Sequence, residues 1–229
     1  MRLQLLLMQL LLCVLPGMEM GASCRLTAWV VEDSSGKVEI TCIGDTMDIV
    51  SPDGLSLWYK ERLTGNYEIT YRVQVVVENG SYDRLSDLNC FWGADDPRHP
   101  DDFFARSAWR NGEFKNYNTL DLYYVGYGGN DNGTTRFREY HGEYYGVDDA
   151  KIKPILKEYT DAAHILKPNH WYEVKIRVEN GATTYAMDGE ELFSLPVADG
   201  KGDGYFALRL WQNHVRFADF QVANIDNLK

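Results

Sequence analysis

The feature that most constrains this chain is a series of short runs in which polar and apolar residues alternate between turn sequences. Asn180 and Gly181 separate two such runs, 171–179 and 183–187, and an Asn-Gly pair in this position is typical of a tight β-hairpin. The only stretch suited to a helical turn is 148–158, where Pro154 limits helix growth. The pattern therefore predicts an all-β chain.

About a dozen strands are expected. Besides the hairpin, alternating or β-branched runs predict strands at 27–31, 37–42, 47–50, 55–59, 67–77, 88–92, 120–127, 134–140, 190–195, 205–211 and 215–222. A turn is expected at 51–54. Residues 93–115 form a long loop, which Phe103, Phe104 and Trp109 predict to be an ordered flap. Many short strands joined by turns favour a sandwich of two antiparallel sheets.

The N-terminus has the pattern of a secretory signal. Arg2 precedes an apolar run at 3–15 that is too short to span a bilayer. We therefore expect a signal peptide at 1–23 and a single β-sandwich domain at 24–229, exported to the periplasm, to the outer-membrane surface or into the medium. Small residues before Cys24 also resemble a lipoprotein cleavage box, although Gly21 stands where Leu is usual. A lipid anchor at Cys24 and plain secretion both stay open.

The cysteines and the charge narrow the function classes. Cys13 is removed with the signal peptide. If Cys24 is lipidated, Cys42 and Cys90 remain. An oxidising compartment permits a disulfide between them, and two free, buried thiols are the alternative. No cysteine spacing indicates zinc. A net charge of −11 disfavours nucleic acid as a partner and fits a soluble monomer. The 15 Tyr and 6 Trp suit sugar rings as well as sheets.

The C-terminal strand order resembles a known superfamily. Runs 171–178, 183–193, 204–209 and 215–222, with their turns, resemble the C-terminal half of concanavalin A-like lectin/glucanase jelly rolls. Segments 83–92, 124–130 and 134–138 resemble an uncharacterised bacterial family that occurs with pectin and rhamnogalacturonan degradation systems of gut Bacteroidetes. The resemblance implies a jelly-roll fold and a carbohydrate ligand, poly- or oligosaccharide, bound across a concave sheet.

Strand alternation predicts which side chains face that groove. Side chains two apart share a face, so Arg136, Arg138 and Tyr140 lie together, as do Arg209, Trp211 and Asn213. A core face would not collect unpaired arginines. An Arg-Trp groove suits an acidic sugar, because guanidinium pairs with carboxylate and indole stacks on the ring. The expected neighbours in substrate binding are Asn89, Trp92, Asn130 and Tyr124. A solvated outer face with Arg–Glu pairs is the alternative.

Two functions fit such a groove. The first, which the sequence favours, is a polysaccharide lyase, in which Arg136 and Arg138 neutralise a uronate, Tyr140 or His141 is the base and Tyr124 the acid. The second is non-catalytic glycan binding within a polysaccharide utilisation system. Hydrolysis by paired carboxylates is disfavoured, because no Glu-x-Asp-x-x-Glu strand is present. No cofactor is expected, apart from a structural calcium ion that Asp219 and the 199–204 loop could hold.

Overall fold

The computed structural model describes residues 24–197 and 201–226, so the predicted signal peptide lies outside the described residues. Twelve strands are present in this part of the chain: β1 (Trp29–Asp33), β2 (Glu39–Ile43), β3 (Thr46–Tyr59), β4 (Tyr67–Val75), β5 (Leu88–Asp95), β6 (Asp121–Gly128), β7 (Thr134–Tyr140), β8 (Ile155–Tyr159), β9 (Trp171–Glu179), β10 (Ala182–Met187), β11 (Glu190–Pro196) and β12 (Tyr205–Asn224). All of their pairings are antiparallel.

The helical segments are short. They are η1 (Leu26–Ala28), η2 (Phe103–Arg106), α1 (Ser107–Arg110), η3 (Phe114–Thr119), α2 (Gly129–Asn132), η4 (Gly142–Tyr144) and α3 (Asp149–Ile152). Within the described part of the chain, no helix has the length and apolar character needed to cross a bilayer.

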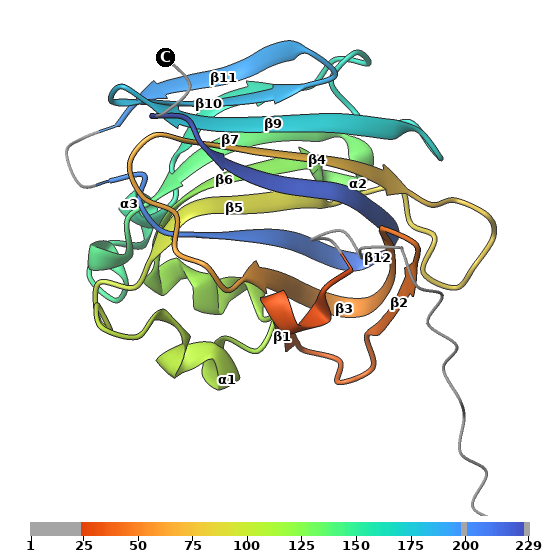
Figure 1. Cartoon of the computed structure of the whole chain (residues 1–229), viewed down its shortest axis with the longest axis horizontal. Helices are drawn as coiled ribbons and strands as arrows, with labels where there is room; N and C mark the ends of the chain where they lie inside the picture. Colours follow the sequence, from red (N-terminus) through yellow and green to blue (C-terminus); the bar gives the residue numbers. More distant parts are fainter. Residues whose placement is uncertain (1–23, 198–200, 227–229) are drawn as a thin grey trace, which may run out of the picture.

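Two long strands, β3 and β12, run through both layers of the sandwich (Figure 1). The first part of β12 pairs with β5 and with residues 54–58 of β3, and its second part pairs with β4 and with residues 47–51 of β3. One sheet, which we call the front sheet, therefore contains β1, β5, β6, β7 and β8 beside residues 54–58 of β3 and the first part of β12. The other, the back sheet, contains β2, β4, β9, β10 and β11 beside residues 47–51 of β3 and the second part of β12. The predicted all-β jelly-roll sandwich is confirmed.

The strand predictions hold in most places. The hairpin across Asn180 and Gly181 is confirmed as β9–β10, with Glu179 opposite Ala182. The turn predicted at 51–54 is wrong, because these residues are extended within β3 and mark its bend. The break between 211 and 215 is likewise a bulge inside β12, where Gln212 has a φ of 49°. Strand β8 was not expected.

Aromatic and aliphatic side chains fill the space between the sheets. Trp92 of β5 stacks near Phe137 of β7 and Tyr185 of β10, with ring centroids 5.9 and 6.1 Å away. Phe137 in turn packs on Phe193 of β11 at 5.0 Å. These contacts join the two layers, and burial of this apolar surface is the main favourable contribution to folding.

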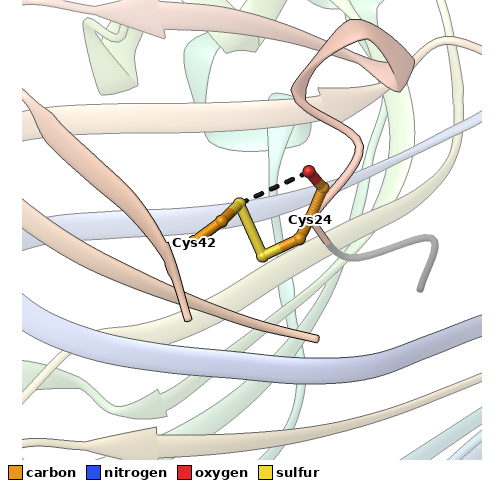
Figure 2. The surroundings of a disulfide bond; sticks show 2 residues. All are labelled: Cys24 and Cys42. Atoms are coloured by element: carbon orange, nitrogen blue, oxygen red, sulfur yellow. Dashed lines mark hydrogen bonds between the residues drawn. A yellow bond between two sulfur atoms is a disulfide. The ribbon is translucent and has the colours of Figure 1, made fainter. Parts of the chain in front are cut away.

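A disulfide joins Cys24 to Cys42, and Cys90 is free and buried (Figure 2). The expected alternative of a Cys42–Cys90 bridge is therefore wrong. The Cys42 sulfur lies 3.3 Å from the carbonyl oxygen of Cys24, and a dashed line marks this contact in Figure 2. A lipid anchor needs the same Cys24 sulfur as a thioether, so this bond and lipidation at Cys24 exclude each other.

Residues 96–119, called the flap below, cover part of the outer face of the front sheet (Figure 1). A buried ion pair holds it there: Arg110 Nε donates to Glu32 Oε1 at 3.0 Å, and both side chains are fully buried. Trp58 and Tyr117 donate to the other oxygen of Glu32 at 3.0 and 2.7 Å. The predicted ordered flap is thus confirmed, anchored on β1 and β3.

Candidate functional site

A pocket opens on the outer face of the front sheet, at the edge of the area that the flap covers. It encloses about 190 Å³, and the side chains that matter most for its chemistry are Asp53, Asn89, Phe114, Tyr124, Arg209 and Trp211. Strands β3, β5, β6 and β12 supply the floor and one side, and the flap supplies the other side. We call this cavity the Arg209 pocket.

Close backbone packing shapes the wall between flap and β3. A Cβ atom built on Gly54 would lie 2.3 Å from the carbonyl oxygen of Gly112, and one on Gly112 would lie 2.2 Å from that of Gly54. Gly112 also has a φ of 73°, which favours glycine. Only glycine at both positions allows this approach, which brings the next flap residues over the sheet.

Arg209 is a buried guanidinium without a carboxylate partner. Its side chain is 3% exposed, and Nη1 donates to the carbonyl oxygen of Gly112 at 2.7 Å. In the described part of the chain, no acidic side chain forms a salt bridge with Arg209. The carboxylate of nearby Asp87 pairs instead with Arg84 at 2.8 Å. Burial lowers the pKa of Arg209, because desolvation penalises its charge. Buried cations are normally paired, so this one is suited to an anion from outside.

Asn89 lies opposite Arg209 on the neighbouring strand and also lines the pocket. Its side chain is 4% exposed, and its Oδ1 has no hydrogen-bond partner among the described residues. Its Nδ2 is a marginal 3.5 Å from Asp87 Oδ1. An unpartnered buried carbonyl is costly, and a ligand hydroxyl could satisfy it.

Trp211 stands at the rim of the pocket. Its side chain is 40% exposed, its Nε1 donates to Asp53 at 3.0 Å, and the Arg84 guanidinium lies 4.5 Å from its ring. These contacts fix the orientation of a large exposed ring. A fixed, partly exposed indole is a suitable stacking surface for a sugar.

A second hollow continues from the Arg209 pocket, and the two share Phe114 and Tyr124. Arg136, Arg138 and Lys153 bring cationic side chains to this hollow, which we call the Lys153 hollow. The two cavities form one groove with Tyr124 between its two parts. Arg136, Arg138, Arg209 and Trp211, which strand alternation predicted to face a groove, all line it.

Two of the predicted site residues are buried away from this groove. Trp92 is fully buried between the sheets, where its Nε1 donates to Thr183 at 2.8 Å, so its prediction as a ligand contact is wrong. Tyr140 faces the same side as the arginines, but it is fully buried against Phe91 and Tyr124, and burial raises its pKa well above the ordinary value. Its prediction as the base is wrong, because substrate cannot reach it.

Three further predicted residues lie outside the two cavities. His141 lines a separate surface hollow with Lys151, and its Nε2 is 3.8 Å from Glu139. Asn130 lies in the turn after β6, where its Nδ2 donates to Thr134. Asn213 is fully buried, with Nδ2 donating to the carbonyl oxygen of Ser86 at 2.8 Å, because the bulge beside it reverses the alternation.

The predicted calcium ligand Asp219 has another partner. Its carboxylate accepts a hydrogen bond from Arg72 Nε. Among the described residues, no group of three or more His, Cys, Asp or Glu side chains is arranged to hold a metal ion. The 199–204 loop lies partly outside the described residues, so the calcium site stays a prediction.

The sequence did not predict that flap residues form part of the site. Phe114 forms part of both cavities, and Lys153 follows α3 at the edge of the Lys153 hollow. The aromatic content of 93–115 indicated an ordered segment but not which sheet face it covers. Asp53 was not predicted as a site residue, because the residues around it were expected to form a turn.

The fold and the groove define a jelly-roll β-sandwich with a candidate ligand site on one sheet. The chain belongs to the family described as domain of unknown function DUF6250, whose model matches residues 49–220. No curated protein sequence matches it.

Solved structures are similar in fold at low sequence identity. A protein of unknown function with galectin-like fold from Bacillus subtilis has a TM-score of 0.65 at 14% identity, covering 87% of this chain and 90% of that one. The carbohydrate-binding module CBM66 from Bacillus subtilis has a TM-score of 0.53 at 11% identity over 85% and 94%. The exoplasmic/lumenal domain of VIP36, in a Ca²⁺- and mannose-bound form, has 0.53 at 11% over 87% and 84%.

Proposed function

We propose that this protein binds an acidic glycan in the groove formed by the Arg209 pocket and the Lys153 hollow. The observation that carries the proposal is Arg209, a buried guanidinium that opens into a cavity and has no carboxylate partner within the described residues. A uronate carboxylate would supply the missing charge in a bidentate pair.

The remaining pocket groups suit a sugar ring rather than a simple anion. Asn89 offers an unused acceptor for a hydroxyl, and Trp211 offers a flat surface at the rim. Apolar lining with a few placed polar groups is typical of small-molecule sites. Two structures of similar fold are described as a carbohydrate-binding module and as a mannose-bound domain, which supports the same ligand class. Resemblance to proteins found with pectin degradation favours a pectic uronate.

Export of the protein fits this role. The Cys24–Cys42 bond is of the kind that persists in oxidising compartments, which agrees with the signal predicted at 1–23. A glycan-binding protein outside the cytoplasm would meet polymeric substrates directly.

A lyase reaction is the second candidate function, and Tyr124 is the observation that favours it. Its ring is part of both cavities, and the charges of Arg209 and Arg138 act to lower its pKa, although burial has the larger effect and raises it. In this reaction the ionised Tyr124 phenolate takes the C5 proton and becomes the neutral phenol, the C–H electron pair forms a C4–C5 double bond, and the C4–O bond breaks. The same proton then passes to the leaving oxygen. The high pKa of Tyr124 makes binding without cleavage the better supported function.

Titration calorimetry with galacturonate oligosaccharides, together with the ultraviolet absorbance of an unsaturated product, tests both functions. We expect binding without new absorbance. Arg209→Met is expected to lose at least about thirtyfold in affinity, equivalent to about 2 kcal/mol for an unpaired charged contact. Arg72→Met, which removes an exposed arginine from β4 of the other sheet, is the matched control. Unchanged affinity in Arg209→Met would remove the proposed site.

A further inference from the structure

The Lys153 hollow holds a pair of cations that the protein does not neutralise. Arg138 Nη1 donates to the backbone carbonyl oxygen of Lys153, which places the two side chains at the same point of the groove. Neither side chain forms a salt bridge with an acidic residue in the part of the chain that the structure describes. The Lys153 ammonium group instead lies 4.7 Å from the ring of Phe114 and 5.6 Å from that of Tyr140.

Arg136 lines the same hollow but, unlike Arg138 and Lys153, it has a carboxylate partner. Its Nε donates to Glu158 of β8, so its charge is already satisfied on the neighbouring strand. Arg138, two residues further along the same face of β7, faces Lys153 instead of an acid. The protein has a net charge of −11, so acidic side chains outnumber basic ones. Two adjacent cations without an acidic partner, Arg138 and Lys153, are therefore unusual in it.

Like charges in a partly buried hollow repel each other. Burial and the nearby Arg138 charge lower the pKa of Lys153. An anion bound between the two side chains would remove the repulsion and replace the lost hydration with charge-assisted hydrogen bonds. The hollow is thus organised for an anion in the same way as the Arg209 pocket.

One aromatic ring connects the two cationic positions. Phe114 lies 5.3 Å from the Arg209 guanidinium and 4.7 Å from the Lys153 ammonium group, and it lines both cavities. A ligand that crosses Phe114 can place one acidic group on each side of the ring. Neighbouring sugars of a linear acidic chain are one source of two such groups.

We propose that Arg138 and Lys153 form a second anion subsite, so that the protein recognises a run of at least two acidic sugars rather than a single one. The inference rests on the proposed function, because the first acidic group is the one bound by Arg209. Carboxylate and sulfate groups share the chemistry that this subsite reads, and both occur on acidic polysaccharides.

Ligand length separates this inference from the proposed function. Affinities are measured by calorimetry for galacturonate, for its trimer and for a sulfated, uronate-free trisaccharide, with wild type, Arg138→Met and Lys153→Met. We expect wild type to bind the galacturonate trimer at least tenfold more tightly than the monomer. Each variant is expected to lose about tenfold for the trimer and less than twofold for the monomer.

Two further variants make the result specific to this charge. Lys151→Met removes an exposed lysine of α3 that pairs with Asp148, and it is expected to change neither affinity. Lys153→Arg retains a cation and is expected to keep the length preference. Thermal unfolding of each variant verifies that it is folded.

The outcomes are distinct. Equal affinity of wild type for monomer and trimer, or a trimer preference that survives in Arg138→Met and Lys153→Met, overturns the second subsite and leaves the Arg209 pocket intact. Failure of all uronate ligands to bind overturns the proposed function itself. Tighter binding of the sulfated trisaccharide than of the galacturonate trimer supports the subsite and identifies sulfate as the group that it reads.

Discussion

Removing the negative charge of Glu32 is expected to destabilise the protein and to loosen the flap. Glu32→Gln keeps the size of the side chain but leaves the fully buried Arg110 guanidinium without its main partner. Breaking one side of a buried ion pair costs about 3–5 kcal/mol. The carboxylate of Asp96 remains 3.9 Å from Arg110, which places the expected loss near the lower limit, about 3 kcal/mol.

Thermal unfolding followed by near-ultraviolet circular dichroism is a suitable assay, because Trp58 and Tyr117 both donate to Glu32 and will report the change locally. A loss of this size corresponds to a fall in melting temperature of about 6–12 °C for a chain of this length. Glu39→Gln, at an exposed position of β2, is the matched control and is expected to change stability by less than about 0.5 kcal/mol.

Ligand affinity gives a second readout of the same change. The flap carries Gly112 and Phe114, which form one wall of the Arg209 pocket, so a looser flap weakens binding as well as stability. A Glu32→Gln protein that unfolds within about 1 kcal/mol of wild type and binds ligand equally well would refute the anchoring role of this ion pair.

Three more changes have defined expectations. Gly54→Ala brings a Cβ atom against the carbonyl oxygen of Gly112, 2.3 Å away in the present geometry, so it should weaken glycan binding in calorimetry; unchanged affinity would contradict the close packing. Cys42→Ser breaks the bond to Cys24 and should lower the free energy of unfolding by about 3 kcal/mol in denaturant titration, an effect that reductant should reproduce in wild type alone. Lys153→Met removes a partly buried cation whose pKa is lowered by burial and by a neighbouring guanidinium. Between that lowered pKa and the ordinary lysine value, the unfolded state therefore binds more protons than the folded state. The stability of wild type relative to Lys153→Met should rise as the pH rises through this window. A pH-independent difference in stability would contradict the lowered pKa of Lys153.

The fold could be predicted from the sequence because most strands have one face in the core and one in solvent. In β9 apolar residues such as Val174 and Ile176 alternate with exposed Lys175 and Arg177, and this strand was predicted correctly. The same alternation placed Arg136, Arg138, Arg209 and Trp211 on a common groove.

Some site predictions failed for identifiable reasons. Strand β5 is buried on both faces, since the flap covers one and the back sheet the other, so its hydrophobic pattern does not show which face meets the core. Asn89 and Trp92 are three residues apart and lie on opposite faces, so they could not both have lined the pocket. The prediction for Asn213 failed because the alternation reverses at Gln212, whose φ is 49°; the register shift there places Pro52 and Asp53 of β3 opposite this one residue. The prediction for Tyr140 failed because side chains from other segments, Phe91, Tyr124 and Lys153, enclose its ring.

The bend that carries β3 and β12 from one sheet into the other lies beside the Arg209 pocket, which Asp53, Gly54, Arg209 and Trp211 all line. A molecule held there contacts both spanning strands at the point where the layers meet, so its binding energy opposes separation of the entire sandwich. Ligand present at a hundred times its dissociation constant would add about 2.7 kcal/mol to the free energy of unfolding. A melting-temperature screen across a panel of glycans can therefore rank candidate ligands before any of them is identified chemically.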